Sequence, residues 1–354
     1  MAQTIDGASA LTWRMRRHFI EGPRAASVEE VVDRLVAVPS WSGDAELAVG
    51  LRMESPSSVA EALEQRRLIK TFAFRGAMNY FTPEDAGVYL ALRSAGRQWE
   101  LPSWREFYGL EPEDWPALRE VVREALAEHS LTQSELARAV TRHKRFAHLR
   151  DALTHNSFTF LKPLAWQGDL SLGPSRDGEA VLQSPADAPG WAGIPSLEDA
   201  GPRAITAYLS AYGPATAGNL QYWLGEGLSA GKRRITDWIA GHEGLATVLV
   251  DGTEMLCLAT DLEEIASTAP STAVHLLPGV DQWVMGPGTA DEFVVPSAHR
   301  AEATRGAALV IRGGRVVGTW KLAKDEVAVT AFEGVELDPA ELDAAVEKIQ
   351  LARR

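Results

Sequence analysis

The chain has 354 residues, 45% of them hydrophobic and 23% charged, and it has no apolar run long enough to cross a membrane. This length predicts about two or three domains. The formal net charge of −13 argues against a nucleic-acid partner, because phosphate contacts need Lys and Arg. The amino terminus lacks the pattern of a secretory signal, and the single cysteine, Cys257, is expected to be a buried thiol. We therefore expect a cytoplasmic protein with no membrane partner.

The first predicted elements lie between residues 27 and 81. Ser27 and Glu30 form a capping box that opens a helix over 28–36. Two further helices are expected over 45–53 and from Ser55-Pro56 to about residue 65. The stretch 68–81 then has the pattern of a β-hairpin that turns near Arg75-Gly76.

A second set of elements follows. An amphipathic helix is predicted over 114–128, and a capping box from Thr132 to Glu135 opens a candidate recognition helix. A helical stretch over 145–158 and short strands are expected next, the strands around 164–166, 170–173 and 179–184. The Pro- and Gly-rich segment 184–203 is the best predicted linker.

The clearest local pattern begins after this linker. Helices are predicted over 205–213, 216–225 and 230–241. Two strands, 245–250 and 253–258, follow and are joined by Asp251-Gly252, a strong hairpin signal. Beyond residue 270 the pattern indicates a small antiparallel sheet with a Gly313-Gly314 turn and a closing helix from residue 338.

Helices followed by a hairpin are the order of elements in a winged helix-turn-helix, and this order can be traced three times before residue 265. We predict a mainly α protein with β-hairpins (α+β), made of three tandem winged helix-turn-helix units and a β-rich C-terminal domain. The predicted domains are 10–95, 96–190, 200–265 and 270–354.

Basic residues form short clusters although the chain as a whole is acidic. A solvated helix face explains any one cluster taken alone, but clusters gathered on one surface would contact duplex DNA. The candidate DNA-binding residues are Arg14, Arg16, Arg17, Arg66, Arg67, Lys70, Arg75, Arg138, Arg142, Lys144, Arg145, Lys232, Arg233 and Arg234.

Several stretches together resemble the AlkZ-like DNA glycosylases, and they occur in the family's order over nearly the whole chain. The most informative are RRLIKTFAFRGAMNYFTPED (66–85), FLKPLAWQGDLSLGP (160–174), AYLSAYGPATAGNLQYWLG (207–225), HLLPGVDQWVMG (275–286) and GRVVGTWKL (314–322). The resemblance implies tandem winged helices around a DNA duplex. It also implies excision of bulky or crosslinked N7-alkylated purines, often protecting a bacterium from its own genotoxic metabolite.

The resemblance places the family's catalytic pair, Gln-x-Gln or Gln-x-Asp, in the link after the first helix. That link is AVPSWSGD (37–44) here, and the two positions are Pro39 and Trp41. An N7-alkylated purine is already a good leaving group, so the pair has to hold a water near the sugar. Proline has no side-chain donor or acceptor, and indole only donates. Ser40, Ser42 and Asp44 are the candidate replacements, with Asp44 as a helix cap in the alternative interpretation.

The next hairpin departs from the family in the same way. The family carries Arg-Gly-Thr-x-His there, and this chain keeps Arg75 and Gly76 but has Ala77 and Asn79 at the Thr and His positions. Asp281 matches a family position, with orientation of the β-rich domain or a buried turn as its possible roles.

Three functions remain open from the sequence. The first is a DNA glycosylase with an altered catalytic site around Ser40 to Asp44, and the second is a catalytically silent protein that binds duplex DNA. The third is a relative that binds a small ligand. No cofactor or metal is expected, since His143, His148 and His155 are irregularly spaced and lack a cysteine partner. We expect a monomer that acts on damaged double-stranded DNA.

Overall fold

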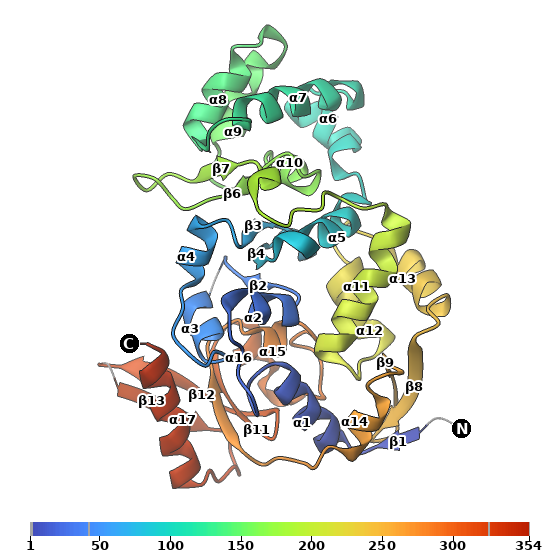
Figure 1. Ribbon diagram of the computed structural model, residues 1–354, viewed down its shortest axis with the longest axis vertical. Helices are drawn as coiled ribbons and strands as arrows, with labels where there is room; N and C mark the ends of the chain where they lie inside the picture. Colours follow the sequence, from blue (N-terminus) through green and yellow to red (C-terminus); the bar gives the residue numbers. More distant parts are fainter. Residues whose placement is uncertain (1–2, 42, 325, 354) are drawn as a thin grey trace. The chain divides into compact units, whose positions relative to one another are not determined.

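The computed structural model describes residues 3–41, 43–324 and 326–353 as a mixture of helices and strands (Figure 1). Packing divides the chain into two compact units. Unit 1 comprises Met1–Val59, Ile205–Trp223 and Thr236–Arg354, and unit 2 comprises Ala60–Ala204 and Leu224–Ile235. Both units therefore combine segments that are distant in the sequence.

Unit 1 holds both ends of the chain and most of its strands. Its helices are α1 (Gly7–Arg17), α2 (Val28–Arg34), α3 (Ala45–Gly50), α12 (Ala217–Leu220), α14 (Leu262–Ser267), α15 (Gln282–Met285), α16 (Arg300–Thr304) and α17 (Pro339–Ala352). Its strands are β1 (Gln3–Ile5), β2 (Val38–Pro39), β8 (Leu245–Val250), β9 (Thr253–Leu258), β10 (Val274–Leu277), β11 (Ala308–Arg312), β12 (Arg315–Ala323) and β13 (Glu326–Ala331).

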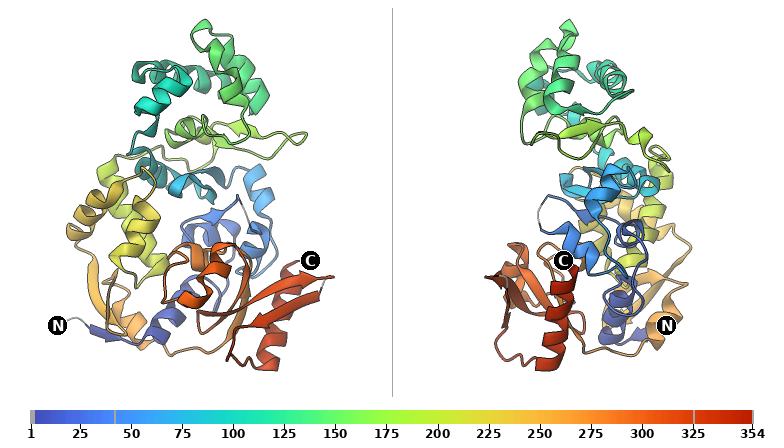
Figure 2. Two further views of the ribbon diagram at one scale, coloured as in Figure 1. Left: turned by 180° about the vertical axis from the view of Figure 1, so that it is seen from behind. Right: turned by 60° about the vertical axis from the view of Figure 1, so that its left-hand side comes forward.

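Two sheets organise unit 1. The predicted hairpin of β8 and β9 is present, and β1 adds to it in parallel, a strand that the sequence analysis missed. Strands β10 to β13 form an antiparallel sheet in chain order, which confirms the predicted β-rich C-terminal region. Helix α17 lies beside this sheet (Figures 1 and 2) and buries Ala345 and Ile349 against Val274 and Trp320.

Unit 2 is richer in helix. Its helices are α5 (Pro83–Ser94), α6 (Pro102–Tyr108), α7 (Trp115–Leu126), α8 (Gln133–Thr141), α9 (Arg150–Thr154) and α10 (Lys162–Trp166). Its strands are β3 (Ile69–Phe72), β4 (Met78–Phe81), β5 (Leu131–Thr132), β6 (Ser171–Leu172) and β7 (Val181–Gln183), paired in the order β4-β3-β6-β7-β5. One apolar core joins these elements, with Trp115 and Leu118 of α7 packed with Phe160 and Trp166.

Three further helices each contain a boundary between the units: α4 (Val59–Glu64), α11 (Leu197–Tyr212) and α13 (Gly231–Ala240).

Local signals in the sequence predicted many elements correctly. The Ser27 side chain caps α2, and the full capping box from Thr132 to Glu135 opens α8. The turn at Asp251-Gly252 has φ angles of 48° and 82°, as a two-residue hairpin requires. The hairpin of β3 and β4 is also present, with Phe72 opposite Met78 and Arg75-Gly76 in its turn.

Three local predictions need correction. Residues 164–166, expected as a strand, belong to helix α10, because Pro163 sits in the first turn of a helix whose apolar residues enter the core of unit 2. The stretch 145–158 is helical only over Lys144–Leu149, as a 3₁₀ helix, and over α9. The linker 184–203 is shorter than expected, since α11 begins at Leu197 and contains Pro202 in its second turn.

The predicted division into four domains stays a prediction. Within the described residues, no helix is both long and apolar enough to cross a membrane.

Candidate functional site

The link between α2 and α3 contains Pro39 and Trp41, the two positions that the sequence is expected to share with the family's catalytic pair. Pro39 ends the short strand β2 and is buried, whereas Trp41 is 52% exposed. Ser42 lies outside the described residues. The side chains of Pro39 and Trp41 offer no oxygen that could accept a hydrogen bond from a water molecule.

Asp44 caps the helix that follows this link. Its Oδ1 accepts a hydrogen bond of 2.9 Å from the backbone N–H of Leu47, as expected for an N-cap residue of α3. The Asp44 side chain is exposed, so its carboxylate remains accessible to solvent while it caps the helix. The neighbouring Ser40 is half-buried, with its hydroxyl buried and without a hydrogen-bond partner among the described residues.

A small cavity lies against the link, within unit 1. Its volume of about 10 Å³ suits a single water molecule, and its lining includes Pro39, Asp44, Asp281 and Gln282. The buried Gln282 donates a hydrogen bond of 2.6 Å from Nε2 to the backbone oxygen of Ala37, while its Oε1 has no partner in the described part of the chain. Gln282 thus places an amide oxygen near the link, which the sequence analysis missed because the residue lies far away in the chain.

Asp281 also fixes the end of helix α3. Nη1 and Nη2 of Arg52 donate hydrogen bonds of 2.9 and 2.7 Å to Oδ2 and Oδ1 of Asp281. Asp281 Oδ1 also accepts from the backbone N–H of Trp283 at the start of α15. Since α15 follows β10, this ion pair connects the segment after α3 to the β-rich part of unit 1.

The β3–β4 hairpin of unit 2 contains the residues that are expected to correspond to a second family motif. Arg75 and Gly76 have φ angles of 52° and 76° in its turn. Asn79, at the family's His position, is buried and donates a hydrogen bond of 3.1 Å to the backbone oxygen of Ala77. The Asn79 amide is therefore engaged inside the hairpin.

Arg14 was predicted to contact DNA, but the structure buries it. Its side chain is 1% exposed, donates a hydrogen bond of 2.8 Å to the backbone oxygen of Pro214, and lies near the rings of Trp283 and Phe293. Burial also lowers the pKa of Arg14. Protein groups surround this guanidinium, and the basic spacing of α1 gave no sign of this burial.

Several of the other predicted residues already have protein partners. Arg17 donates hydrogen bonds to the backbone and side-chain oxygens of Ser210, at 3.2 and 2.7 Å. Arg66 pairs with Asp187 at 2.7 Å, and Arg145 with Asp114 at 2.7 Å. Arg67 donates to Gln65, and Lys70 lies 5.6 Å over the ring of Tyr80.

Apart from the half-buried Arg75, the remaining predicted cations are exposed. Arg138 projects from α8, and Arg142 and Lys144 follow directly at its end, so these three share one region of unit 2. Arg16 in α1 and the three basic residues of α13, Lys232, Arg233 and Arg234, are exposed as well. The end of α8 and the start of α13 are therefore the two places where several predicted cations are exposed together.

Two further cations of unit 2 were missed from the sequence. Arg93 in α5 and Lys162 in α10 are buried and half-buried, and no carboxylate in the described part of the chain forms an ion pair with either. Each is isolated in the sequence, so no basic cluster marked them.

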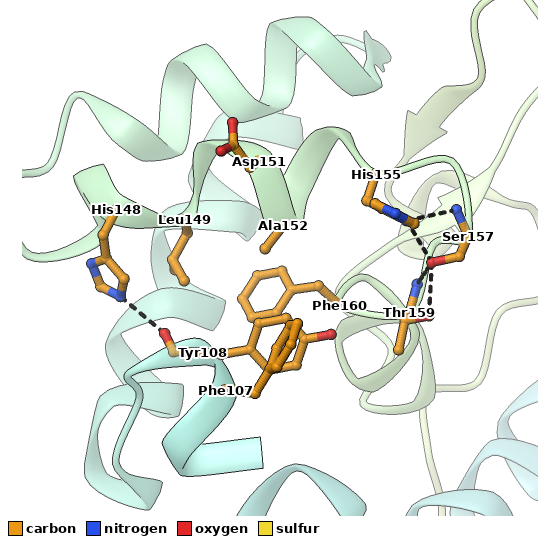
Figure 3. Close-up of a pocket in the computed structure, with 10 residues that line it drawn as sticks. All are labelled: Phe107, Tyr108, His148, Leu149, Asp151, Ala152, His155, Ser157, Thr159 and Phe160. Atoms are coloured by element: carbon orange, nitrogen blue, oxygen red, sulfur yellow. Dashed lines mark hydrogen bonds between the residues drawn. The ribbon is translucent and has the colours of Figure 1, made fainter. Parts of the chain in front are cut away.

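Two of the histidines considered in the sequence, His148 and His155, lie at a cavity. No group of three or more His, Cys, Asp or Glu side chains suited to a metal ion occurs among the described residues. His148 and His155 instead line a cavity of about 500 Å³ in unit 2, together with the rings of Phe107, Tyr108 and Phe160 (Figure 3). The His148 Nε2 lies 3.1 Å from the backbone oxygen of Tyr108.

Comparison with known proteins identifies the family of this chain. The family described as "DNA glycosylase AlkZ-like" matches residues 32–351. The "Interstrand DNA cross-link repair glycosylase" of Streptomyces sahachiroi is 38% identical over 348 residues, which cover 95% of this chain and 92% of that protein. The solved structure of the Streptomyces sahachiroi DNA glycosylase AlkZ superposes with a TM-score of 0.91 at 34% identity, covering 99% of this chain and 97% of the other. The chain therefore belongs to the AlkZ-like DNA glycosylase family.

Proposed function

We propose that this protein binds duplex DNA at N7-alkylated purines, as a monomer, and that it has lost the water activation by which its family hydrolyses the N-glycosidic bond. The observation that carries this proposal is the catalytic link, where Pro39 is buried and Trp41 is 52% exposed. These residues replace a pair of side chains that would hold a water molecule.

DNA binding rests on family membership and on the basic surfaces of unit 2. In a winged helix-turn-helix, the recognition helix enters the major groove and flanking cations contact phosphates. Helix α8 has the capping box and the exposed Arg138, Arg142 and Lys144 that this role requires. Three winged-helix units in tandem would extend such contacts along the duplex.

The loss of hydrolysis follows from side-chain chemistry. The bond between sugar and an N7-alkylated purine breaks readily, and the enzyme's main task is to position water and stabilise the sugar cation. Proline cannot take part in a side-chain hydrogen bond, and the tryptophan N–H can only donate one. The exposed indole suits stacking on a base or insertion into the duplex.

The competing interpretation is an enzyme with a displaced carboxylate. Asp44 and Gln282 both line the cavity beside the link, which has room for about one water. In that case Asp44 would accept the proton of the attacking water. Its use as the cap of α3 favours the silent protein instead.

The decisive test uses a duplex that contains a single N7-methylguanine. Binding is measured by fluorescence anisotropy, and excision by heat and alkali cleavage at abasic sites. We expect the parent to bind without releasing base, and Pro39→Gln with Trp41→Gln to gain excision while Pro39→Ala with Trp41→Ala does not. Parent excision that is lost in Asp44→Asn would establish the enzyme instead. A parent that fails to bind any duplex would refute the proposal.

A second candidate function is the binding of a small ligand, and the cavity in Figure 3 favours it. Its volume of about 500 Å³ is in the range of ligand pockets. Phe107 is 80% exposed at this cavity, and the hydroxyls of Ser157 and Thr159 lie 2.8 Å apart at its polar side. A protein that binds no duplex but binds a planar aromatic compound, and loses this binding on Phe107→Ala, would support this candidate.

A further inference from the structure

Arg93 and Lys162 direct their charges to one point of unit 2. A Cβ atom placed on Gly76, in the β3–β4 turn, would lie 3.8 Å from Nη2 of Arg93 and 3.9 Å from Nζ of Lys162. Gly76 has no side chain there, so no side chain of the turn comes between the two cations. Two like charges that face one point repel each other, and an anion at that point would relieve the repulsion.

The surroundings hold both cations in place without neutralising them. The Arg93 guanidinium lies 3.8 Å over the ring of Trp166, and the Lys162 amine lies 5.2 Å over the ring of Phe72. An aromatic face attracts a cation but does not remove its charge. In the described part of the chain, neither residue forms an ion pair with a carboxylate.

Burial of these two positive charges is unfavourable in free energy. Arg93 is 5% exposed, and its Nε is buried without a hydrogen-bond partner among the described residues. Desolvation lowers the pKa of Arg93 to about 10, and desolvation followed by the charge of Arg93 lowers the pKa of Lys162. A buried charge without a partner is unfavourable, and a bound anion would relieve the cost.

A purely structural role would explain the position of Arg93 but not that of Lys162. Nη1 of Arg93 donates a hydrogen bond of 2.9 Å to the backbone oxygen of Leu228, and Nη2 donates one of 3.0 Å to the Gln98 side chain. These bonds fix the guanidinium plane. The Lys162 amine has no hydrogen-bond acceptor among the described residues, although it faces the same point.

We propose that Arg93 and Lys162 bind one phosphate of the DNA backbone, against the protein backbone at Gly76. The proposal rests on the proposed function for the identity of its ligand. A tetrahedral oxyanion can accept charged hydrogen bonds from both side chains at once. The site would fix the hairpin on the duplex backbone without reading the base sequence.

The test compares Lys162→Gln and Arg93→Gln with Lys321→Gln, which removes an exposed lysine of β12 in unit 1. Lys162→Gln is the safer variant, because Lys162 is only half-buried. Thermal stability is measured in inorganic phosphate and in chloride at equal ionic strength. Affinity for an undamaged duplex is measured at several salt concentrations.

We expect phosphate to raise the melting temperature of the parent and of Lys321→Gln, and to do so much less in Lys162→Gln. Duplex affinity should fall about tenfold in Lys162→Gln, with a shallower dependence on salt. Equal stabilisation of all these proteins by phosphate would overturn the site. If phosphate stabilises the protein only when Lys162 is present, but Lys162→Gln leaves duplex affinity unchanged, the site binds an anion that is not a phosphate of DNA. A parent that binds no duplex contradicts the proposed function, while the phosphate result still decides whether the anion site exists.

Discussion

Arg52 and Asp281, separated by 229 residues in the sequence, form an almost completely buried ion pair with two hydrogen bonds, at 2.9 and 2.7 Å. We predict that Asp281→Ala lowers the free energy of unfolding by about 3–5 kcal/mol, because it leaves the Arg52 guanidinium buried without its counter-ion. Urea unfolding measures the effect. The matched control is Asp85→Ala, which breaks the exposed pair with Arg203 and should cost less than about 1 kcal/mol. Equal losses in the two variants would contradict this assignment.

His18 should make the protein sensitive to mild acid. Burial, followed by the charges of Arg52 and Arg14, lowers the pKa of His18 well below 6.5. The unfolded chain therefore binds a proton in a pH range where the folded protein does not, and stability must fall as the pH drops below about 6.5. The loss should approach about 1.4 kcal/mol per pH unit in this range. The free energy of unfolding, measured with urea between about pH 7.5 and 5, should fall less steeply with decreasing pH in His18→Asn than in the parent. Parallel curves for the two proteins would show that His18 does not cause the acid sensitivity.

The hairpin of β8 and β9 depends on its glycine. Gly252 has a φ of 82°, and no atom lies within 4 Å of the position that a Cβ would take there, so only backbone strain opposes a side chain. We predict that Gly252→Val lowers the free energy of unfolding by about 1–3 kcal/mol. Gly252→Asn is the control and should cost less, since asparagine tolerates this conformation. Similar values for the two variants would show that strain is not the cause.

Asp44 should contribute to stability as a cap whether or not it takes part in chemistry. Its Oδ1 accepts from the Leu47 N–H at 2.9 Å, so we predict that Asp44→Ala costs about 1 kcal/mol, measured by urea unfolding. Asp44→Ser keeps a capping oxygen and should restore most of this stability. If both variants are as stable as the parent, the cap does not stabilise α3.

The basic end of α8 should govern the salt dependence of duplex binding. Replacing Arg142, Lys144 and Arg145 together with alanine should reduce the slope of log affinity against log salt by about 0.9 for each phosphate that is no longer neutralised. Arg145 is expected to contribute least, because it already pairs with Asp114. Anisotropy titrations from low to physiological salt provide the slope. A slope equal to that of the parent would place the DNA contacts elsewhere.

The sequence by itself determined the elements whose signals are local, and it determined the family. The Ser27 cap, the Thr132 capping box and the Asp251-Gly252 turn act on neighbouring backbone groups, so a single sequence is enough to place them. The chemistry of Pro39 and Trp41 was equally visible, because a side chain without a hydrogen-bond acceptor lacks one in any fold. Helix α10 was misjudged, since a short apolar run fits a strand or a buried helix equally well.

Only the tertiary structure decided which charges face solvent. Arg14 and Arg16 stand two residues apart in one basic cluster, yet Arg14 is buried and Arg16 is exposed. The pairing of Arg52 with Asp281, and the convergence of Arg93 and Lys162 on Gly76, join segments far apart in the chain. Burial of a charge depends on which distant segments pack around it, and a sequence pattern shows only the near neighbours of each residue.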